Sequence, residues 1–430
     1  MVDDYSIRNE FSIYNAQDFL ESVSTEKMYI FVGKTSEWPD ETDAPTPTSS
    51  EQMMINAWDN MILTKRISSA NMSLAIKRYN WTSGTTYIPW DSEDGLMREK
   101  RFYVITHDNR VYKCLDSIPN TPSTIEPTDT GITPVRLSDG YTWKFMYDLS
   151  SADLVKFNDT EVIPVKYLTQ NDGSLQWEVQ QYAIPGTINR IEVLNGGSGY
   201  TECNVEIEGD GTGASATVVL NNDGSVRYVI VTNTGQGYTW ANVRFVGNGS
   251  VSAIGRVILS PIKGHGSNPV QELFGSNVIS SVTFEGNEGG KFPIGIKFRQ
   301  IGLIVNPYLY GTETVAELSG ANQQYTTLSC SGISGTFVEG EYINIMSRSI
   351  ANVAQIVKVD SSRLLVNVVK GEIEENDLIQ GSTSGTSAEV INVSEPILQN
   401  YSGEMLYLEN RSPISKIENQ SETYRLVIKF

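Results

Sequence analysis

The feature that most constrains this chain is an internal repeat, in which a glycine-rich segment occurs twice, 38 positions apart. Residues 191–220 (IEVLNGGSGYTECNVEIEGDGTGASATVVL) correspond to residues 229–258 (VIVTNTGQGYTWANVRFVGNGSVSAIGRVI). The shared positions are Asn195, Gly197, Gly199, Tyr200, Thr201, Val205, Gly209 and Gly211, which recur as Asn233, Gly235, Gly237, Tyr238, Thr239, Val243, Gly247 and Gly249. Two copies cannot form a long solenoid, so we expect the pair to close into one small β module.

The glycines of GDGTGASA, residues 209–216, have the close spacing of a phosphate-binding loop. Such a loop needs a strand before the glycines and, after them, a helix whose N-terminus faces the anion. Here the glycines of the two copies are followed by ASATVVL and SAIGRVIL, which are short, alternating and β-branched. These segments predict strands, so we expect Gly209–Gly213 to form a turn in which glycine supplies positive φ, and no nucleotide site.

Two other ligand interpretations of this repeat are weaker. The segment NGGSGYT begins like a calcium-binding nonapeptide, but that pattern requires an Asp where this chain has Thr201. Tyr200 and Tyr238 either stack on sugars or pack over their own turns, and packing is the more frequent role for such a tyrosine.

A second repeat pairs GTFVEGEYINI, from Gly335, with GEIEENDLIQG, from Gly371. Its acidic residues alternate with apolar ones, which predicts antiparallel strands with the acids on a solvated face. These acids are Glu339 and Glu341 in the first copy, and Glu375 and Asp377 in the second. Paired carboxylates are also typical of glycosidases, but a solvated surface is the favoured interpretation here.

Helical patterns are concentrated near the start of the chain. Residues 9–23 place Phe11, Tyr14 and Phe19 near one helical face, followed by Leu20 and Val23. Residues 48–67 begin with a capping-box spacing and then carry a stripe of apolar residues, which predicts a second helix. The capping box is Thr48 and Glu51, and the stripe is Met54, Trp58, Met61 and Ile62. Beyond residue 66, short β-branched and aromatic runs predict small antiparallel β domains with large loops.

The charge and the rare residue types disfavour several classes of function. The chain has 51 acidic and 32 basic residues, a formal charge of -19 that disfavours binding to nucleic acid. Its three cysteines are far apart and form no CxxC pair, so we expect neither a zinc site nor a disulfide framework. The two histidines, His107 beside a turn and His265 in a glycine loop, are expected to be structural. We therefore expect no catalytic residues, metal or cofactor.

The sequence shows no targeting or membrane signal. No apolar run approaches the roughly 18 residues of a membrane-spanning helix, and the N-terminus MVDDYSIRNE is unlike a signal peptide. The sequence thus predicts synthesis in a cytoplasm and no membrane insertion.

Several segments outside the repeats resemble one known family, the dimeric baseplate wedge subunit of T-even-type contractile phage tails. The most specific are KFRQIGLIVNP (residues 297–307) and YSGEMLYLENRSPI (401–414). Others are YIFVGKTSEWPDE, MMINAWDNMILTKRI, RYNWTSGTTYIPWD, VYKCLD, DGYTWKFMYDL and the final YRLVIKF. They cover about half of the chain in the family's order, and the two repeat modules lie between them as insertions would.

The resemblance implies an α+β, mainly β protein with a discontinuous α+β first domain built from both chain ends and several inserted antiparallel β-sandwich or barrel-like domains. The implied ranges are 1–80, 297–320 and 396–430 for the first domain, 81–185 and 262–296 for β domains, and 186–261 and 321–395 for the repeat modules. It also implies a virion structural protein of the tail baseplate, made in the host cytoplasm, that is not an enzyme. Its partners would be itself, as a homodimer, and other wedge proteins.

A candidate interface lies in the block YSGEMLYLENRSPI. We name Glu404, Tyr407 and Arg411 as its candidate residues, because tyrosine and arginine contribute strongly at interfaces, although one more core strand would explain this block equally well. The main alternative function is a glycan-binding or glycan-cleaving tail protein, motivated by 21 tyrosines, 7 tryptophans and small β modules. An aromatic-lined groove that holds close carboxylates would favour this alternative.

Overall fold

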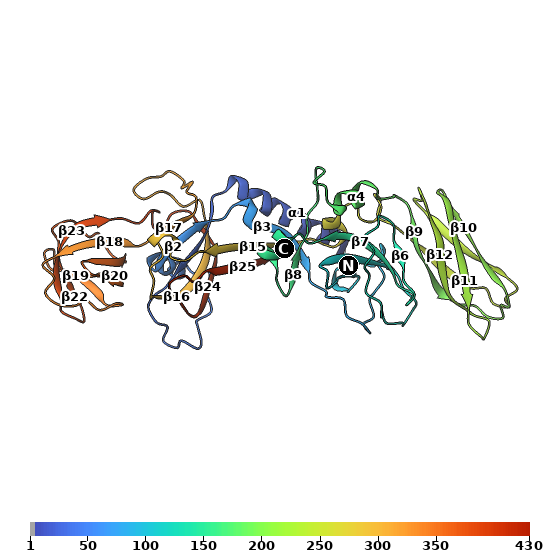
Figure 1. Cartoon of the computed structure of the whole chain (residues 1–430), viewed down its shortest axis with the longest axis horizontal. Coiled ribbons are helices and arrows are strands. Elements are labelled where there is room, and N and C mark those ends of the chain that lie inside the picture. Colours follow the sequence, from blue (N-terminus) through green and yellow to red (C-terminus); the bar gives the residue numbers. More distant parts are fainter. Residues whose placement is uncertain (1–4) are drawn as a thin grey trace. The chain divides into compact units, whose positions relative to one another are not determined.

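The computed structural model describes residues 5–430, with side chains from Glu10 onward, and within this range the chain forms 25 strands and five α-helices (Figure 1). The strands form several antiparallel sheets and a closed six-stranded barrel, which confirms the predicted α+β, mainly β class. The chain divides into two compact units. The first combines the segment ending at Phe19 with Ser73–Ile279 and Leu426–Phe430, and the second combines Leu20–Met72 with Ser280–Arg425. The finer division into domains stays a prediction.

The second unit contains a five-stranded sheet with the order β17-β2-β1-β16-β24. Its strands are β1 (Met28–Gly33), β2 (Met61–Arg66), β16 (Lys297–Val305), β17 (Ala321–Gln323) and β24 (Glu404–Ser415). Every residue of β1 is buried, and β16 is buried after its first residue, so neither strand shows the alternation of a strand with one solvated face. Only glycine fits at position 302, because a Cβ there would lie 2.5 Å from the Phe31 ring.

The predicted helix over residues 48–67 is wrong in its second half. Helix α2 (Glu51–Asp59) is capped by Ser50, whose Oγ accepts a hydrogen bond from Met53 N at 3.3 Å, and not by Thr48. The chain then enters β2, where Met61 and Ile62 are fully buried. A short run of buried apolar residues fits a helix stripe and a central strand equally well, so periodicity could not separate the two.

Helix α1 (Tyr5–Thr25) confirms the first predicted helix but buries a different face. Ile13, Ala16 and Val23 are buried, whereas Phe11 and Tyr14 are 65% and 55% exposed. The three buried positions follow helical spacing, and Phe11 and Tyr14 lie outside that stripe, whereas Phe19 is partly buried and its ring packs on Phe430 at a centroid distance of 5.5 Å.

The six-stranded barrel belongs to the second unit and contains the second repeat (Figure 1). Its strands are β18 (Thr326–Ser331), β19 (Tyr342–Ile345), β20 (Ile350–Asp360), β21 (Arg363–Val368), β22 (Leu378–Gly381) and β23 (Ser387–Ser394). The order β18-β21-β20-β19-β22-β23 is unchanged when the first three strands are exchanged for the last three, so the barrel has approximate two-fold symmetry. Its core includes Phe337 and Ile373, which occupy equivalent positions in the repeat.

The prediction that all four acids of this repeat lie on a solvated strand face is wrong for Glu341 and Asp377. Both are 5% exposed and precede β19 and β22 instead of lying within them. The Glu341 carboxylate accepts hydrogen bonds from the amides of Thr383 and Ser384 at 2.9 and 2.8 Å. Asp377 contacts the equivalent positions of the other copy, but through side chains: it accepts from Ser347 Oγ and Arg348 Nε at 2.9 and 3.0 Å. Each acid is buried because it is hydrogen-bonded to a loop of the opposite repeat, which covers it.

The first unit contains the sheet β4-β5-β7-β6. Its elements are β4 (Tyr103–Ile105), β5 (Arg110–Asp116), β6 (Val135–Arg136), β7 (Thr142–Asp148), and the helices α3 (Ser151–Phe157), α4 (Leu175–Gln181) and α5 (Pro269–Glu272). Its core is aromatic, with Tyr141 stacked on Trp143 at a centroid distance of 5.7 Å. His107 lies in the β4–β5 turn, where its ring contacts Glu126.

The glycine-rich repeat of the first unit forms three two-stranded sheets, β10-β13, β11-β12 and β14-β9 (Figure 1). The strands are β9 (Ile188–Asn195), β10 (Cys203–Gly209), β11 (Thr212–Leu220), β12 (Val226–Gln236), β13 (Ala241–Gly247) and β14 (Ile254–Leu259). Each copy contributes three strands, and every sheet joins one strand from each copy. No sheet of this module can therefore form from one copy alone.

The tyrosines at the equivalent positions of the two copies also reach into the opposite copy. A Cβ on Gly211 would lie 2.4 Å from the Tyr238 ring, and a Cβ on Gly249 would lie 2.5 Å from the Tyr200 ring. The expectation that each tyrosine packs over its own turn is thus incomplete. The turn between β10 and β11 is confirmed, but Gly211 is required by the approach of a ring and not by a positive φ, which among its glycines only Gly213 adopts.

The remaining strands form the sheet β25-β15-β3-β8. These are β3 (Met72–Lys77), β8 (Val162–Pro164), β15 (Asn277–Phe284) and β25 (Glu422–Lys429), and the 3₁₀ turns are Ser69–Asn71, Met97–Glu99 and Glu288–Gly290. Among the described residues, no helix has the length and apolar character needed to cross a membrane.

Candidate functional site

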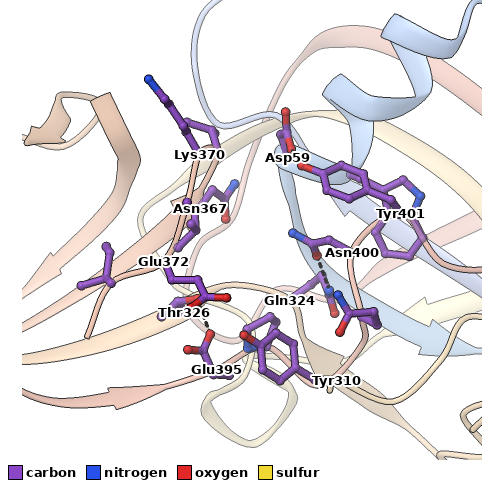
Figure 2. Close-up of a pocket in the computed structure, with 17 residues that line it drawn as sticks. Asp59, Tyr310, Gln324, Thr326, Asn367, Lys370, Glu372, Glu395, Asn400 and Tyr401 are labelled. Carbon is purple, nitrogen blue, oxygen red and sulfur yellow. Dashed lines mark hydrogen bonds between the residues drawn. The ribbon is translucent and has the colours of Figure 1, made fainter. Parts of the chain in front are cut away.

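A cavity of about 230 Å³ lies in the second unit, where segments distant in sequence converge (Figure 2). The end of α2, strand β18, the loop after β21 and the loop before β24 all line it. The polar and aromatic lining residues are Trp58, Asp59, Tyr310, Gln324, Thr326, Asn367, Lys370, Glu372, Glu395, Gln399, Asn400 and Tyr401. We call this cavity the Tyr401 pocket.

Three carboxylates contribute to the Tyr401 pocket. Burial raises the pKa of Asp59, although a hydrogen bond from the Tyr401 hydroxyl lowers it in part. Burial also raises the pKa of Glu395, while the hydroxyls of Tyr310 and Thr326 act in the opposite direction. Thr326 Oγ1 donates to Glu395 Oε2 at 3.4 Å. A carboxyl group with a raised pKa is suited to hydrogen bonding and to proton transfer.

The aromatic residues of the pocket are partly exposed. Tyr310 and Tyr401 are 41% and 54% exposed, so their rings are accessible to a ligand. Tyr401 has φ of 61°, a left-handed conformation that is uncommon outside glycine, asparagine and aspartate and often marks a functional position. Figure 2 shows Tyr401 and Asp59 across the pocket from Asn367, Lys370 and Glu372.

The amide groups of the pocket include an unused acceptor. Asn367 is 5% exposed, and its Oδ1 has no hydrogen-bond partner in the described part of the chain. Gln324, in contrast, is fully engaged through Nε2, which donates to Leu398 O at 2.7 Å and Asn400 Oδ1 at 3.0 Å. Buried polar atoms are nearly always paired, so an unpaired acceptor such as Asn367 Oδ1 calls for an explanation, and a hydrogen-bond donor on a ligand would supply the missing partner.

These groups can bind a polyhydroxylated ligand. Carboxylates and the free amide oxygen accept hydrogen bonds from hydroxyls, Lys370 donates, and tyrosine rings pack on the apolar face of a sugar ring. Within residues 5–430, no set of three His, Cys, Asp or Glu side chains is placed to hold a metal ion.

The predicted interface residues lie elsewhere, on β24 at the edge of the five-stranded sheet. Tyr407 Oη and Arg411 Nε both donate to Glu409, at 3.0 and 2.7 Å, and burial and Glu409 raise the pKa of Tyr407 to about 12. Glu404 lies at the start of the strand, about 23 Å from Arg411 along the strand at the usual rise per residue. The structure thus brings Tyr407 and Arg411 together but not Glu404.

Sequence reasoning did not find the residues of the Tyr401 pocket. Several lining residues lie in segments that the sequence analysis had marked for other reasons: Trp58 and Asp59 in the predicted second helix, Glu372 in the second repeat and Tyr401 in the block YSGEMLYLENRSPI. The other lining residues have no motif. A sequence alone cannot indicate that Asp59 and Tyr401 are neighbours, because 341 intervening residues carry no local signal of that contact.

No protein-family model matches this chain, and no curated protein matches it at a significant level.

Proposed function

We propose that this chain is a structural component of the baseplate wedge of a contractile phage tail, where it assembles as a homodimer and with other wedge proteins. In this proposal it is made in the host cytoplasm and becomes part of the virion. The proposal rests on the family resemblance, which the arrangement of the resembling segments supports.

The segments that carry the resemblance fold side by side. YIFVG forms most of β1, MILTKR forms β2, KFRQIGLIV forms β16, and EMLYLENRS lies in β24, which are consecutive in the sheet order β2-β1-β16-β24. In the first unit, VYKCLD in β5 pairs with TWKFMYD in β7. Segments far apart in sequence that build common sheets are expected of one inherited domain framework, and this observation carries the proposal.

Strand β24 offers a route to assembly because it is an edge strand. Edge strands expose backbone hydrogen-bonding groups that pair readily with another chain. Part of the edge is covered, since Trp38 Nε1 donates to Arg411 O at 2.9 Å and Asn410 Nδ2 donates to Pro45 O at 2.7 Å. We therefore expect an interface at this edge to involve side chains such as that of Arg411.

Assembly provides the test. The chain is co-expressed with the other wedge proteins of the same virus, and complexes are measured by sedimentation. Arg411→Ala should weaken assembly without loss of folding, because Arg411 is exposed and surface ion pairs contribute at most about 1 kcal/mol. Arg363→Ala is the matched control, since this exposed arginine also pairs with a nearby carboxylate, Asp360. No complex with any wedge protein, or equal effects of both substitutions, would contradict the proposal.

A second candidate function is glycan binding, and the free acceptor of Asn367 in the Tyr401 pocket favours it. Calorimetry with oligosaccharides from the host surface tests this candidate. Asn367→Leu and Glu395→Gln should each weaken binding, whereas Glu389→Gln, on an exposed barrel position outside the pocket, should not. Absence of binding, or binding insensitive to both pocket substitutions, would remove the glycan candidate.

A further inference from the structure

A second cavity, of about 380 Å³, lies in the first unit. Strands β6, β7, β9 and β12 line it together with the loop that holds His265. Its charged and polar lining includes Lys144, Asn189 and His265, and its rim carries Tyr182 and Ile184, which are 63% and 45% exposed. We call it the Lys144 cavity.

The Lys144 cavity contains a buried positive charge without a carboxylate of its own. Lys113 and Lys144 are directly opposite on β5 and β7, and both are almost completely buried. Lys113 Nζ pairs with Glu272 Oε2 at 2.8 Å, while Glu272 Oε1 accepts from Gly266 N at 2.7 Å. Lys144 Nζ donates to the Ile132 carbonyl. Opposed like charges are unfavourable, and a buried charge is costly unless it is paired.

Two residues that line this cavity each have a buried side-chain atom with no hydrogen-bond partner in the described structure, Asn189 Nδ2 and His265 Nε2. Asn189 is 7% exposed and His265 is 6% exposed. His265 Nδ1 lies 3.4 Å from Glu272 Oε2, and because a carboxylate only accepts, Nδ1 carries the proton. His265 Nε2 is then an acceptor. The residues that line the cavity therefore include an ammonium, an unpaired amide donor and an unpaired imidazole acceptor.

We propose that the Lys144 cavity binds a hydroxylated carboxylic acid of monosaccharide size. The ligand carboxylate would pair with Lys144 and accept a hydrogen bond from Asn189 Nδ2, and a ligand hydroxyl would donate to His265 Nε2. The exposed Tyr182 and Ile184 at the rim would cover the apolar face of the ligand. This binding site is independent of the assembly role and of the Tyr401 pocket.

The charges around Lys144 determine how binding depends on pH. Burial lowers the pKa of Lys144 to about 8, although Glu272 raises it in part. Burial and then Lys113 lower the pKa of His265 to about 4, so this ring is neutral at pH 6.5 and above. Burial raises the pKa of Glu272, but the opposing effects of Lys113 and His265 are larger and bring it down to about 2.

The other charged groups at this cavity are already paired. Arg136 and Asp116 neutralise each other at 2.7 Å, and Lys113, whose pKa burial also lowers, is paired with Glu272. Between pH 6.5 and 9.5 the ligand charge is constant, so affinity should fall as Lys144 loses its proton, by roughly tenfold or more.

Calorimetry on the whole chain tests the proposal with three matched compounds. Glucuronate carries the carboxylate and the hydroxyls, glucose lacks the carboxylate, and cyclohexanecarboxylate lacks the hydroxyls. We expect glucuronate to bind at pH 6.5, at least about tenfold more tightly than glucose, as for loss of one charge-assisted contact. It should also bind more tightly than cyclohexanecarboxylate. No detectable glucuronate binding, or equal binding of glucose, would overturn the proposal.

Variants connect this binding to the cavity. Lys144→Met should abolish glucuronate binding and its pH dependence, while the exposed Lys166→Met should change neither. Lys144→Met removes a buried charge and should not lower the melting temperature of the free protein. If it nevertheless fails to fold, Asn189→Leu should weaken glucuronate binding at least about fivefold. Binding that both cavity substitutions leave unchanged would place the ligand elsewhere and refute the inference.

Discussion

Gly211→Ala should destabilise the glycine-rich module because the added methyl group meets a ring of the opposite repeat. The new Cβ would lie 2.4 Å from Tyr238 Cγ, 2.5 Å from Tyr238 Cδ2 and 2.7 Å from Gln236 O. Carbon atoms in contact prefer about 3.5–4.0 Å, so the ring must move by roughly 1 Å in a buried site. Overpacking of this kind costs about 1–3 kcal/mol.

The local effect can be measured by hydrogen exchange with mass spectrometry, which separates the module from the rest of a chain that need not unfold in one step. A loss of 1–3 kcal/mol corresponds to exchange that is roughly 5- to 150-fold faster in peptides from β10 to β13. Gly249→Ala should have a similar effect, because its Cβ would lie 2.5 Å from Tyr200 Cε1.

A double variant separates the ring contact from other consequences of losing the glycine. In a Tyr238→Ala background most of the clash is absent, so the additional effect of Gly211→Ala should be clearly smaller than in the native chain. Unchanged exchange in Gly211→Ala, or fully additive effects in the double variant, would show that the ring does not restrict this position.

Three further predictions concern buried charges and the modules. Asp377→Asn should lower the melting temperature at pH 7 and reduce the acid sensitivity of the barrel. Burial raises the pKa of Asp377, but Arg348, the Glu374 amide and the Ser347 hydroxyl lower it by more, to below the ordinary value of 3.8. The stabilisation by this carboxylate is therefore complete above the ordinary value and is lost as the pH falls through the lower folded pKa. Glu272→Gln should destabilise the first unit by about 3–5 kcal/mol, seen in calorimetric melting, because it leaves a buried lysine without its carboxylate. Replacement of residues 186–261 by a short Gly/Ser linker should leave the rest of the chain folded by circular dichroism when Asp91→Asn is added, since the deletion also removes the arginines that neutralise this buried acid. Unchanged melting of either charge variant, or aggregation of the deletion variant, would contradict the corresponding argument.

The repeats and the strand-rich character could be predicted because their signals are local. Glycine clusters, β-branched alternation and the offsets of the two repeats are all contained in short stretches, and the structure confirms strands on both sides of Gly209–Gly213. The same local pattern misassigned residues 61–66, because a central strand with continuous burial resembles the buried stripe of a helix.

Contacts between residues far apart in sequence explain why the solvated positions predicted for two acids were wrong and why the sequence did not indicate the two cavities. Alternation suggested that Glu341 and Asp377 face solvent, yet loops of the opposite repeat cover both. The Tyr401 pocket and the Lys144 cavity likewise consist of side chains that only the tertiary fold brings together. Lys113 and Lys144 lie in ordinary apolar strands, and nothing nearby in sequence indicates that they lie opposite each other or that Glu272 pairs with Lys113.

The exchange of strands between the two glycine-rich copies affects the order of events during synthesis. Strand β9 ends at Asn195 and pairs with β14, which begins at Ile254, so the first copy has no complete sheet while only its own residues have left the ribosome. At about 5–20 residues per second, β9 remains unpaired for roughly 3–12 s after it is made. During that interval β9 is an unpaired strand, which can pair with β14 of a neighbouring nascent chain that carries the same repeat. Closely spaced chains on one polysome therefore have an opportunity to form domain-swapped pairs.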